Sequence, residues 1–212
     1  MSQPKSANIT HQEACVTRVQ REARLGQRGA TVWLTGLSAS GKSTVARLVD
    51  QALHQRGKHS CVLDGDNIRF GLNRDLGFSP EDRNENIRRI GEVSRLFSSN
   101  GAIALTAFIS PYRGDRDRNR AIHGAGDFVE VHVDCPLEVC EARDPRGLYQ
   151  RARRGDIPEF TGISAPYEPP LHPELVLRTD LESPDESAAR VVEYLERNAY
   201  LQPKVLETVE AR

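Results

Sequence analysis

The chain has 212 residues, of which 38% are apolar and 28% are charged, and its formal net charge is −1. This length and apolar content suit a single α/β domain with a substantial core. A net charge near zero argues against bulk nucleic-acid binding, which needs a broad basic surface. No apolar run approaches the ~18 residues that a membrane span needs. We therefore expect neither a nucleic-acid nor a membrane partner.

The N-terminal segment, residues 1–28, is polar and is predicted to be a separate arm, with a helical stretch between Glu13 and Leu25. It lacks the apolar run of a signal peptide. The cysteines are scattered and have no zinc-site spacing, which is typical of reduced thiols, although a disulfide through the first of them stays open. These features predict a cytoplasmic protein. The cysteines are Cys15, Cys61, Cys135 and Cys140.

The first predicted strand, Ala30–Thr35, leads into a loop that fits the P-loop pattern G-x-x-x-x-G-K-[ST], and an amphipathic helical pattern follows from Val45 to Leu53. Glycines let successive N–H groups point at phosphate oxygens, and the next helix adds its positive N-terminal dipole. In such a loop the lysine neutralises the β- and γ-phosphates, and the serine hydroxyl ligates Mg²⁺. We predict catalytic Lys42, metal-binding Ser43 and an ATP site made of Gly36, Leu37, Ser38, Ala39, Ser40, Gly41, Lys42, Ser43 and Thr44.

The second predicted strand, Ser60–Leu63, is followed by two carboxylates, Asp64 and Asp66. In open α/β sheets the ligand crevice lies at the carboxyl ends of the strands. Carboxylates at that place can hold Mg²⁺ through water and accept a proton from a hydroxyl. A helix N-cap followed by a turn is the alternative for the same residues. We predict that both carboxylates are catalytic.

Several arginines and glycines follow over residues 69–89, and arginine binds phosphate or sulfate oxygens in a bidentate way. Some of these arginines, among them Arg88 or Arg89, must instead be solvated charges on a helix. That helix is predicted from Pro80 to Asn100, because Ser79 can cap it and proline suits the first helical position. Its inward-facing residues are expected to be Ile87, Ile90, Val93, Leu96 and Phe97.

The third predicted strand, Ile103–Phe108, leads to Ser110, which is predicted to cap a helix that begins at Pro111. The run from Arg113 to Arg120 contains interleaved aspartates and is typical of an ion-paired helix surface. The fourth strand is predicted at Phe128–Val133.

The last predicted strand is Leu175–Leu177, and the last helix starts at Ser183, where the sequence SPDE has the signature of a capping box. Alternating strands and helices predict a P-loop NTPase-type α/β fold, in which a doubly wound, mostly parallel sheet has helices on both faces. The last helix is expected to bury Ala188, Val191, Val192 and Leu195.

A series of segments resembles the adenylylsulfate kinase family, and the resemblance extends from about residue 8 to residue 197. The first segment alone is generic, but the whole series in this order is highly specific. The segments are Gly36–Thr44 (GLSASGKST), Asp64–Arg69 (DGDNIR), Gly71–Phe78 (GLNRDLGF), Asp82–Arg89 (DRNENIRR), Phe108–Arg116 (FISPYRGDR), Val133–Glu138 (VDCPLE), Cys140–Tyr149 (CEARDPRGLY) and Phe160–Pro166 (FTGISAP).

The resemblance implies a reaction of sulfate activation, in which ATP phosphorylates the 3′-hydroxyl of adenosine 5′-phosphosulfate to give 3′-phosphoadenosine 5′-phosphosulfate and ADP. It implies that Asp64 lies near this hydroxyl, and that Asp66 lies near Mg²⁺ and the phosphates. It also implies a homodimer. The positions that would bind the substrate are Arg69, Arg83 and Asn86 for the phosphosulfate and ribose, and Phe78 and Phe160 for the adenine.

Ser110 stands at the position that the family associates with a proposed phosphoserine. A serine nucleophile needs an activating base, and the adjacent residues supply none. We therefore expect Ser110 to have a structural or binding role, while a base from elsewhere in the fold stays open.

The segment RARRG, residues 151–155, falls where the family has a mobile basic lid, which we place at about residues 147–165. Arg151 replaces a lysine there, Arg154 replaces a small residue, and Phe70 stands where histidine is common. The expected organisation is an arm (1–28), a kinase domain (29–203) and a C-terminal tail (204–212).

Two other functions compete with this reading. A small P-loop kinase acting on a sugar or nucleoside would share the P-loop, but the segments after Asp64 argue against it. A non-catalytic nucleotide-binding subunit could lose Lys42 or Asp64 without penalty, whereas this chain has both.

Overall fold

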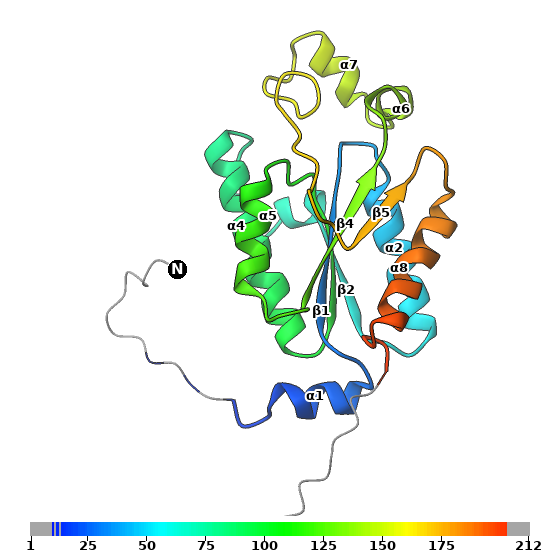
Figure 1. Cartoon of the computed structure of the whole chain (residues 1–212). Helices are drawn as coiled ribbons and strands as arrows, with labels where there is room; N and C mark the ends of the chain where they lie inside the picture. Colours follow the sequence, from blue (N-terminus) through cyan, green and yellow to red (C-terminus); the bar gives the residue numbers. More distant parts are fainter. Residues whose placement is uncertain (1–9, 11, 13, 203–212) are drawn as a thin grey trace, which may run out of the picture.

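The protein is built around a five-stranded, all-parallel sheet with the strand order β2-β3-β1-β4-β5 (Figure 1). The computed structural model describes residues 10, 12 and 14–202. The strands occupy the predicted apolar runs and confirm the doubly wound parallel fold. They are β1 (Ala30–Thr35), β2 (Ser60–Asp64), β3 (Ile103–Ala107), β4 (Phe128–Asp134) and β5 (Leu175–Arg178).

Helices cover both faces of the sheet, with α2 and α8 on one face and α4 and α5 on the other (Figure 1). Helices α6 and α7 lie beyond the carboxyl ends of the strands, and α1 lies beside their amino ends. In the described part of the chain, no helix is long and apolar enough to cross a membrane. The helices are α1 (Arg18–Leu25), α2 (Lys42–Gln55), α3 (Gly65–Arg69), α4 (Pro80–Ser99), α5 (Arg113–Ile122), α6 (Leu137–Arg143), α7 (Leu148–Arg153) and α8 (Pro184–Arg197).

Side chains of β1 alternate between two apolar layers, as the two-residue period of a strand requires. Val32 and Leu34 pack in the layer under α2 and α8. Trp33 points to the other face, where its ring stacks with Phe108 and Phe128. Because both faces of the sheet are covered, every residue of β1 and β3 is buried, and these two strands do not alternate between apolar and polar residues.

The two long helices that begin with proline have the predicted N-caps. The Ser79 hydroxyl accepts a hydrogen bond from the Asp82 amide, and Ser183 and Glu186 form a capping box at the start of α8. Each cap satisfies backbone donors that the first turn of a helix leaves without partners. Helix α8 also buries the predicted residues, which are Ala188, Val191, Val192 and Leu195.

The predicted inward face of α4 is partly wrong. Ile87 and Ile90 are buried, and Val93 packs partly against them. Leu96 and Phe97, however, are 57% and 38% exposed, because the second half of α4 buries the same side of the helix as Ile87 and Ile90, and at 3.6 residues per turn Leu96 lies opposite Ile87. The buried positions in that half are small: Gly91, Ser94 and Ser98.

Helix α1 is attached to the amino-terminal edge of the sheet. Buried Glu22 accepts a hydrogen bond from the Gly29 amide (3.0 Å), and the Gln27 side chain donates to the carbonyl groups of His59 and Gly101 (2.8 Å each). Arg18 forms an ion pair with Asp127, just before β4. The predicted C-terminal tail (204–212) and the first nine residues of the arm lie outside the described residues.

Candidate active site

The P-loop joins β1 to α2 and depends on two glycines with positive φ. A Cβ atom on Gly36 would lie 2.5 Å from the Val133 carbonyl oxygen, so no larger residue fits there. Gly41 has a φ of 100° and is the N-cap of α2. The first turn of α2 therefore starts directly at the loop, and its backbone N–H groups and positive dipole end favour an anion.

Lys42 is held against its own loop. Its Nζ atom donates to the carbonyl groups of Gly36 (2.9 Å) and Leu37 (2.6 Å), with the Ser40 hydroxyl at 3.4 Å. Burial lowers the pKa of Lys42 to about 8, and the negative charges of Asp64 and Asp66 are among the groups that oppose this shift. The loop thus keeps its lysine ammonium group beside the expected phosphate position.

A cavity of about 1500 Å³ opens at the carboxyl ends of the strands, and residues of the sheet edge and of the α6–α7 region line it. The lining brings most of the predicted site residues together. They are Ser38, Ala39, Gly41, Lys42, Ser43 and Thr44 of the P-loop region, and Asp64, Asp66, Arg69, Phe78, Arg83, Asn86, Ser110 and Phe160. The remaining predicted P-loop residues, Gly36, Leu37 and Ser40, contact Lys42 from within the loop.

The two carboxylates after β2 differ in their contacts. One oxygen of Asp64 accepts a hydrogen bond from the Asp66 amide (3.1 Å), so Asp64 is the N-cap of the short helix α3. Capping engages one carboxylate oxygen of Asp64, and Asp64 also lines the cavity. The catalytic role and the helix-cap role that were expected as alternatives are therefore compatible. Asp66 forms an ion pair with Arg146, between α6 and α7. Arg146 is not among the predicted site residues, although it lies in the segment CEARDPRGLY, which already carries the family resemblance.

Arg69 and Arg83 form a positively charged end of the cavity. The Arg69 guanidinium carbon lies 4.2 Å from the centre of the Phe78 ring. Arg83 donates to the Thr161 hydroxyl (3.1 Å) and to the Glu159 carbonyl (2.7 Å). Burial and the positive charge of Arg83 lower the pKa of Arg69. Two guanidinium groups that repel each other in this way are suited to an anion between or beside them.

Two other arginines of this region, Arg88 and Arg89, do not line the cavity. Arg88 pairs with Glu85, and Arg89 bridges Glu85 and Asp75 at 2.7–2.9 Å. These are the solvated helix charges that the sequence predicts.

The two aromatic residues predicted to flank adenine have different environments. Phe78 is 66% exposed and is held on one side by Arg69. Phe160 is buried and meets Tyr149 edge-on, with 5.1 Å between the ring centres. Both residues line the cavity. Phe160 forms part of its packed wall, whereas Phe78 presents an exposed ring to a planar ligand.

Ser110 is not the helix cap that the sequence predicts. Helix α5 begins two residues later than expected, with Tyr112 as its N-cap residue. Ser110 has a φ of 37°, whereas a serine that caps a helix through its hydroxyl typically has an extended backbone, as Ser79 and Ser183 do. Instead, Trp33 Nε1 donates to the Ser110 hydroxyl (3.0 Å), and Arg116 donates to the Ser110 carbonyl oxygen (2.6 Å). Within the described residues, no carboxylate or imidazole is hydrogen-bonded to this hydroxyl.

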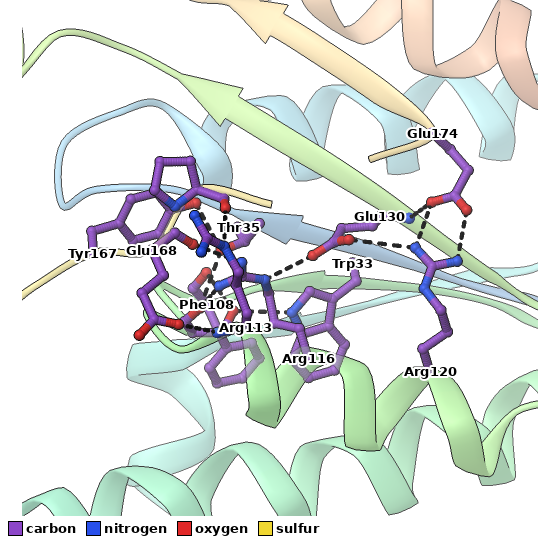
Figure 2. A network of polar contacts seen from close by, with 12 residues as sticks. Trp33, Thr35, Phe108, Arg113, Arg116, Arg120, Glu130, Tyr167, Glu168 and Glu174 are labelled. Carbon is purple, nitrogen blue, oxygen red and sulfur yellow. Dashed lines mark hydrogen bonds and ion pairs between the residues drawn. The ribbon is translucent and has the colours of Figure 1, made fainter. Parts of the chain in front are cut away.

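Helix α5 is also less of a surface helix than predicted. Arg116 is only 1% exposed, and it pairs with Glu130 of β4 (2.7 Å) and donates to the Glu168 carbonyl (2.7 Å; Figure 2). Arg120 continues the network to Glu130 and Glu174. These arginines connect the sheet with the chain segment that returns from α7 to β5.

The predicted basic lid contains helix α7 and lies over the P-loop. The Tyr149 hydroxyl donates to the Ser38 carbonyl oxygen (3.0 Å). Arg151 lines the cavity, whereas Arg153 and Arg154 pair with acidic neighbours, Glu141 and Asp156. Of these three lid arginines, Arg151 is thus the one whose side chain a ligand in the cavity could reach.

Comparisons with known proteins agree with this geometry. Residues 28–178 match the family model for adenylylsulphate kinase. An adenylyl-sulfate kinase from Saccharomyces cerevisiae is 60% identical over 182 residues, which cover 85% of this chain and 90% of the yeast protein. A structure of the Mycobacterium tuberculosis APS kinase in complex with AMPPNP and APS is 50% identical with a TM-score of 0.77, and the match covers 80% of this chain and 99% of that one.

A hexameric APS kinase from Thiobacillus denitrificans is 35% identical with a TM-score of 0.63, and the match covers 84% of this chain and 30% of that one. The family match spans the P-loop, the carboxylates after β2 and the lid, which are the segments that surround the cavity. The chain belongs to the adenylylsulfate kinase family, whose members are ATP-dependent kinases of adenylylsulfate.

Proposed function

We propose that this chain transfers the γ-phosphoryl group of ATP to the 3′-hydroxyl of adenylylsulfate, with each end of the cavity serving one substrate. One observation carries the proposal: a single cavity contains Lys42 of the P-loop, the strand-end carboxylate of Asp64 and the arginine pair Arg69 and Arg83. A nucleotide anchored by the P-loop and an anionic acceptor anchored by the arginines would meet at the carboxylate.

At the nucleotide end, Lys42 and the N–H groups of the P-loop stabilise the charge on the phosphoryl group during in-line transfer. Ser43 would hold Mg²⁺, with Asp66 nearby. The described residues contain no cluster of three or more His, Cys, Asp or Glu side chains that could hold a metal ion. This fits Mg²⁺, which keeps water and phosphate oxygens as ligands and needs few from the protein. When bound, the ion neutralises charge on the β- and γ-phosphates.

At the acceptor end, Asp64 orients or deprotonates the 3′-hydroxyl, which attacks the γ-phosphorus in line with the leaving oxygen of ADP. Arg69, Arg83 and Asn86 hold the phosphosulfate and the ribose. Phe78 and Phe160 enclose the adenine. Direct transfer needs no covalent enzyme intermediate, so Ser110 serves the site by shaping its wall.

The decisive experiment is Asp64→Asn, measured as ADP release with and without adenylylsulfate. Asparagine retains an oxygen that can accept the α3 capping hydrogen bond, so the fold should survive. We expect kcat to fall by about 10²–10⁴-fold, the usual contribution of a general base, while ATP binding is largely kept. Asp50→Asn, on α2 outside the cavity lining, is the matched control.

Turnover within a few-fold of wild type in Asp64→Asn would make Asp64 a structural cap only. The wild-type assay also tests the competing functions. No adenylylsulfate-dependent ADP release would indicate a non-catalytic subunit, and release with a sugar or nucleoside but not adenylylsulfate would indicate a different small-molecule kinase.

We further propose that the protein is a cytoplasmic homodimer. The dimer rests on the family resemblance, and light scattering after gel filtration measures it directly. The location is supported by the absence of disulfides among the described residues, whose cysteines are free, with Cys135 and Cys140 buried. Fractionation of cells that express the chain tests this location.

A further inference from the structure

We infer that Asn73, a residue outside the cavity, positions the cavity residue Asn86 so that its amino group faces the acceptor substrate. The inference rests on the proposed role of Asn86 in binding adenylylsulfate, and it adds a residue that acts through Asn86 without touching the ligand.

Asn73 lies in the turn between α3 and α4 and is completely buried. Its Nδ2 atom donates to the Oδ1 atom of Asn86 on α4 (2.9 Å). Its own backbone is held in the turn, because the Asn73 amide donates to the Ile68 carbonyl (3.0 Å) and its carbonyl accepts from the Leu76 amide (3.1 Å). Asn73 is therefore a fixed donor behind Asn86.

Asn86 is 5% exposed and is one of the residues that line the cavity. With its Oδ1 atom engaged by Asn73, the atom left for a ligand is Nδ2, for which the described residues provide no hydrogen-bond partner. An amide N–H donor matches the oxygens of phosphate, sulfate or ribose, whereas a carbonyl oxygen would repel the first two.

The opposite orientation of the two side-chain amides is less favourable. In the observed arrangement the acceptor Asn73 Oδ1 lacks a partner, and the Nδ2 group uses one of its two N–H donors, on Asn86. Reversing both amides would pair Oδ1 but leave both N–H donors of Asn73 buried without a partner, and buried donors without partners are rarer in proteins than acceptors without partners. The surroundings of Asn73 thus select the rotamer of Asn86.

The test changes Asn73 from a donor to an acceptor with the variant Asn73→Asp. The new carboxylate would accept from Nδ2 of Asn86, so the Asn86 carbonyl oxygen would turn to the cavity. We expect the Kd for adenylylsulfate, measured by calorimetry, to rise about tenfold or more, the scale of losing a hydrogen bond to a charged group. The Kd for ATP should stay within about twofold, because the P-loop does not contact Asn73.

An added negative charge could also repel the substrate directly, so the same change is made in an Asn86→Ala background. The amide mechanism predicts that Asn73→Asp then has no more than about a twofold effect, whereas charge repulsion or general damage would persist. Asn73→Ala is measured in the same two backgrounds. We expect it to raise the Kd for adenylylsulfate about threefold, and this effect should also disappear with Asn86→Ala. Asn73→Ala provides the test if Asn73→Asp does not fold.

Asn84→Ala is the matched control, because Asn84 is also on α4 but donates to Asp115 of α5. It should lower the melting temperature without changing the ratio of the two dissociation constants. Equal effects of the Asn73 variants in both backgrounds would overturn the inference and leave the role of Asn86 intact. If Asn86→Ala itself binds adenylylsulfate normally, the proposed role of Asn86 fails, and the inference fails with it.

Discussion

The Lys42 ammonium group donates hydrogen bonds to carbonyl oxygens of the P-loop, and it is also placed to neutralise phosphate. We expect Lys42→Ala to fold and to lose about 10²–10³-fold in kcat, as when a preorganised charge-stabilising donor is removed. Steady-state ADP release and a thermal melt measure the two properties. Lys58→Ala is the control, because Lys58 also donates to a backbone carbonyl, at Gly26, outside the cavity. A folded Lys42→Ala enzyme with near-normal turnover would contradict the assignment.

Ser110 contributes its hydroxyl to a buried hydrogen bond with Trp33. We expect Ser110→Ala to retain substantial turnover, because direct transfer requires no phosphoserine. Its free energy of unfolding should fall by about 1–3 kcal/mol, since the Trp33 N–H group loses its buried partner. Urea denaturation measures this loss.

Labelling tests the nucleophile hypothesis for Ser110 directly. Wild-type enzyme is incubated with γ-labelled ATP and then chased with adenylylsulfate. Stoichiometric label on Ser110 that moves to product at a rate matching kcat would show that this serine is the nucleophile.

Arg83 supplies a guanidinium group at the acceptor end of the cavity. We expect Arg83→Ala to weaken adenylylsulfate binding by about 1.5–3 kcal/mol, the usual value of a hydrogen bond to a charged group, and to change ATP binding much less. Calorimetry with each ligand measures the difference. Arg88→Ala, on the same helix but paired with Glu85 at the surface, should affect neither ligand. Equal weakening of both ligands by Arg83→Ala would be incompatible with the assignment.

Among the helices, the close contact between α4 and α5 depends on Gly91. A Cβ atom there would lie 2.0 Å from Asn119 Oδ1, and this side chain is buried and donates to the Ile87 carbonyl, so it cannot move away freely. Overpacking costs about 1–3 kcal/mol, while replacing glycine with alanine in a helix returns up to about 1 kcal/mol. We therefore expect Gly91→Ala to be destabilised by about 1–2 kcal/mol in urea denaturation.

Gly114 provides the control for this helix contact. It lies on α5, and a Cβ atom there would meet only Arg118 Nη1 at 3.7 Å. Gly114→Ala should therefore be neutral or slightly stabilising. If both glycine variants had the same stability, the fit between the helices would not be limiting.

At the scale of the whole molecule, Asp127 attaches α1 to the end of the sheet opposite the cavity. It receives hydrogen bonds from Arg18 and Arg28 (2.9 Å each). Removing it should cost about 1.5–3 kcal/mol and make α1 more accessible to trypsin, with unchanged adenylylsulfate turnover. Urea denaturation and limited proteolysis of Asp127→Ala test this, with Arg24→Ala on the exposed side of α1 as the control. Lost turnover at unchanged stability would contradict the attachment role.

The same attachment should depend on pH. Burial raises the pKa of Asp127, but the hydrogen bonds and charges of Arg18 and Arg28 outweigh burial and hold it below the ordinary 3.8. The ionised Asp127 carboxylate therefore makes its full contribution to the free energy of unfolding above its ordinary pKa of 3.8. This contribution is lost as the pH falls through the lower pKa that Asp127 has in the folded protein. The stability difference between wild type and Asp127→Ala should shrink only at such acidic pH, and a difference that already disappears near neutrality would contradict this.

Local signals in the sequence determined much of this protein. The five strands were predictable because the sheet is covered on both faces, so each strand is rich in apolar residues. The P-loop and the Ser79 and Ser183 caps were predictable because their hydrogen bonds connect residues close in the chain. The same holds for Asp64, whose position at the end of a strand already indicates the ligand crevice.

Only the tertiary structure decided the features that depend on which segments meet. Leu96 and Phe97 were expected to face inward because they are apolar, but α5 approaches the side of α4 that carries Gly91, and the buried positions there are too small or too polar to form an apolar pattern. Arg116 looked like a surface charge until the fold placed Glu130 and the Glu168 carbonyl around it. A buried polar group is stable only with partners, and when these lie far away in the chain no local pattern contains them.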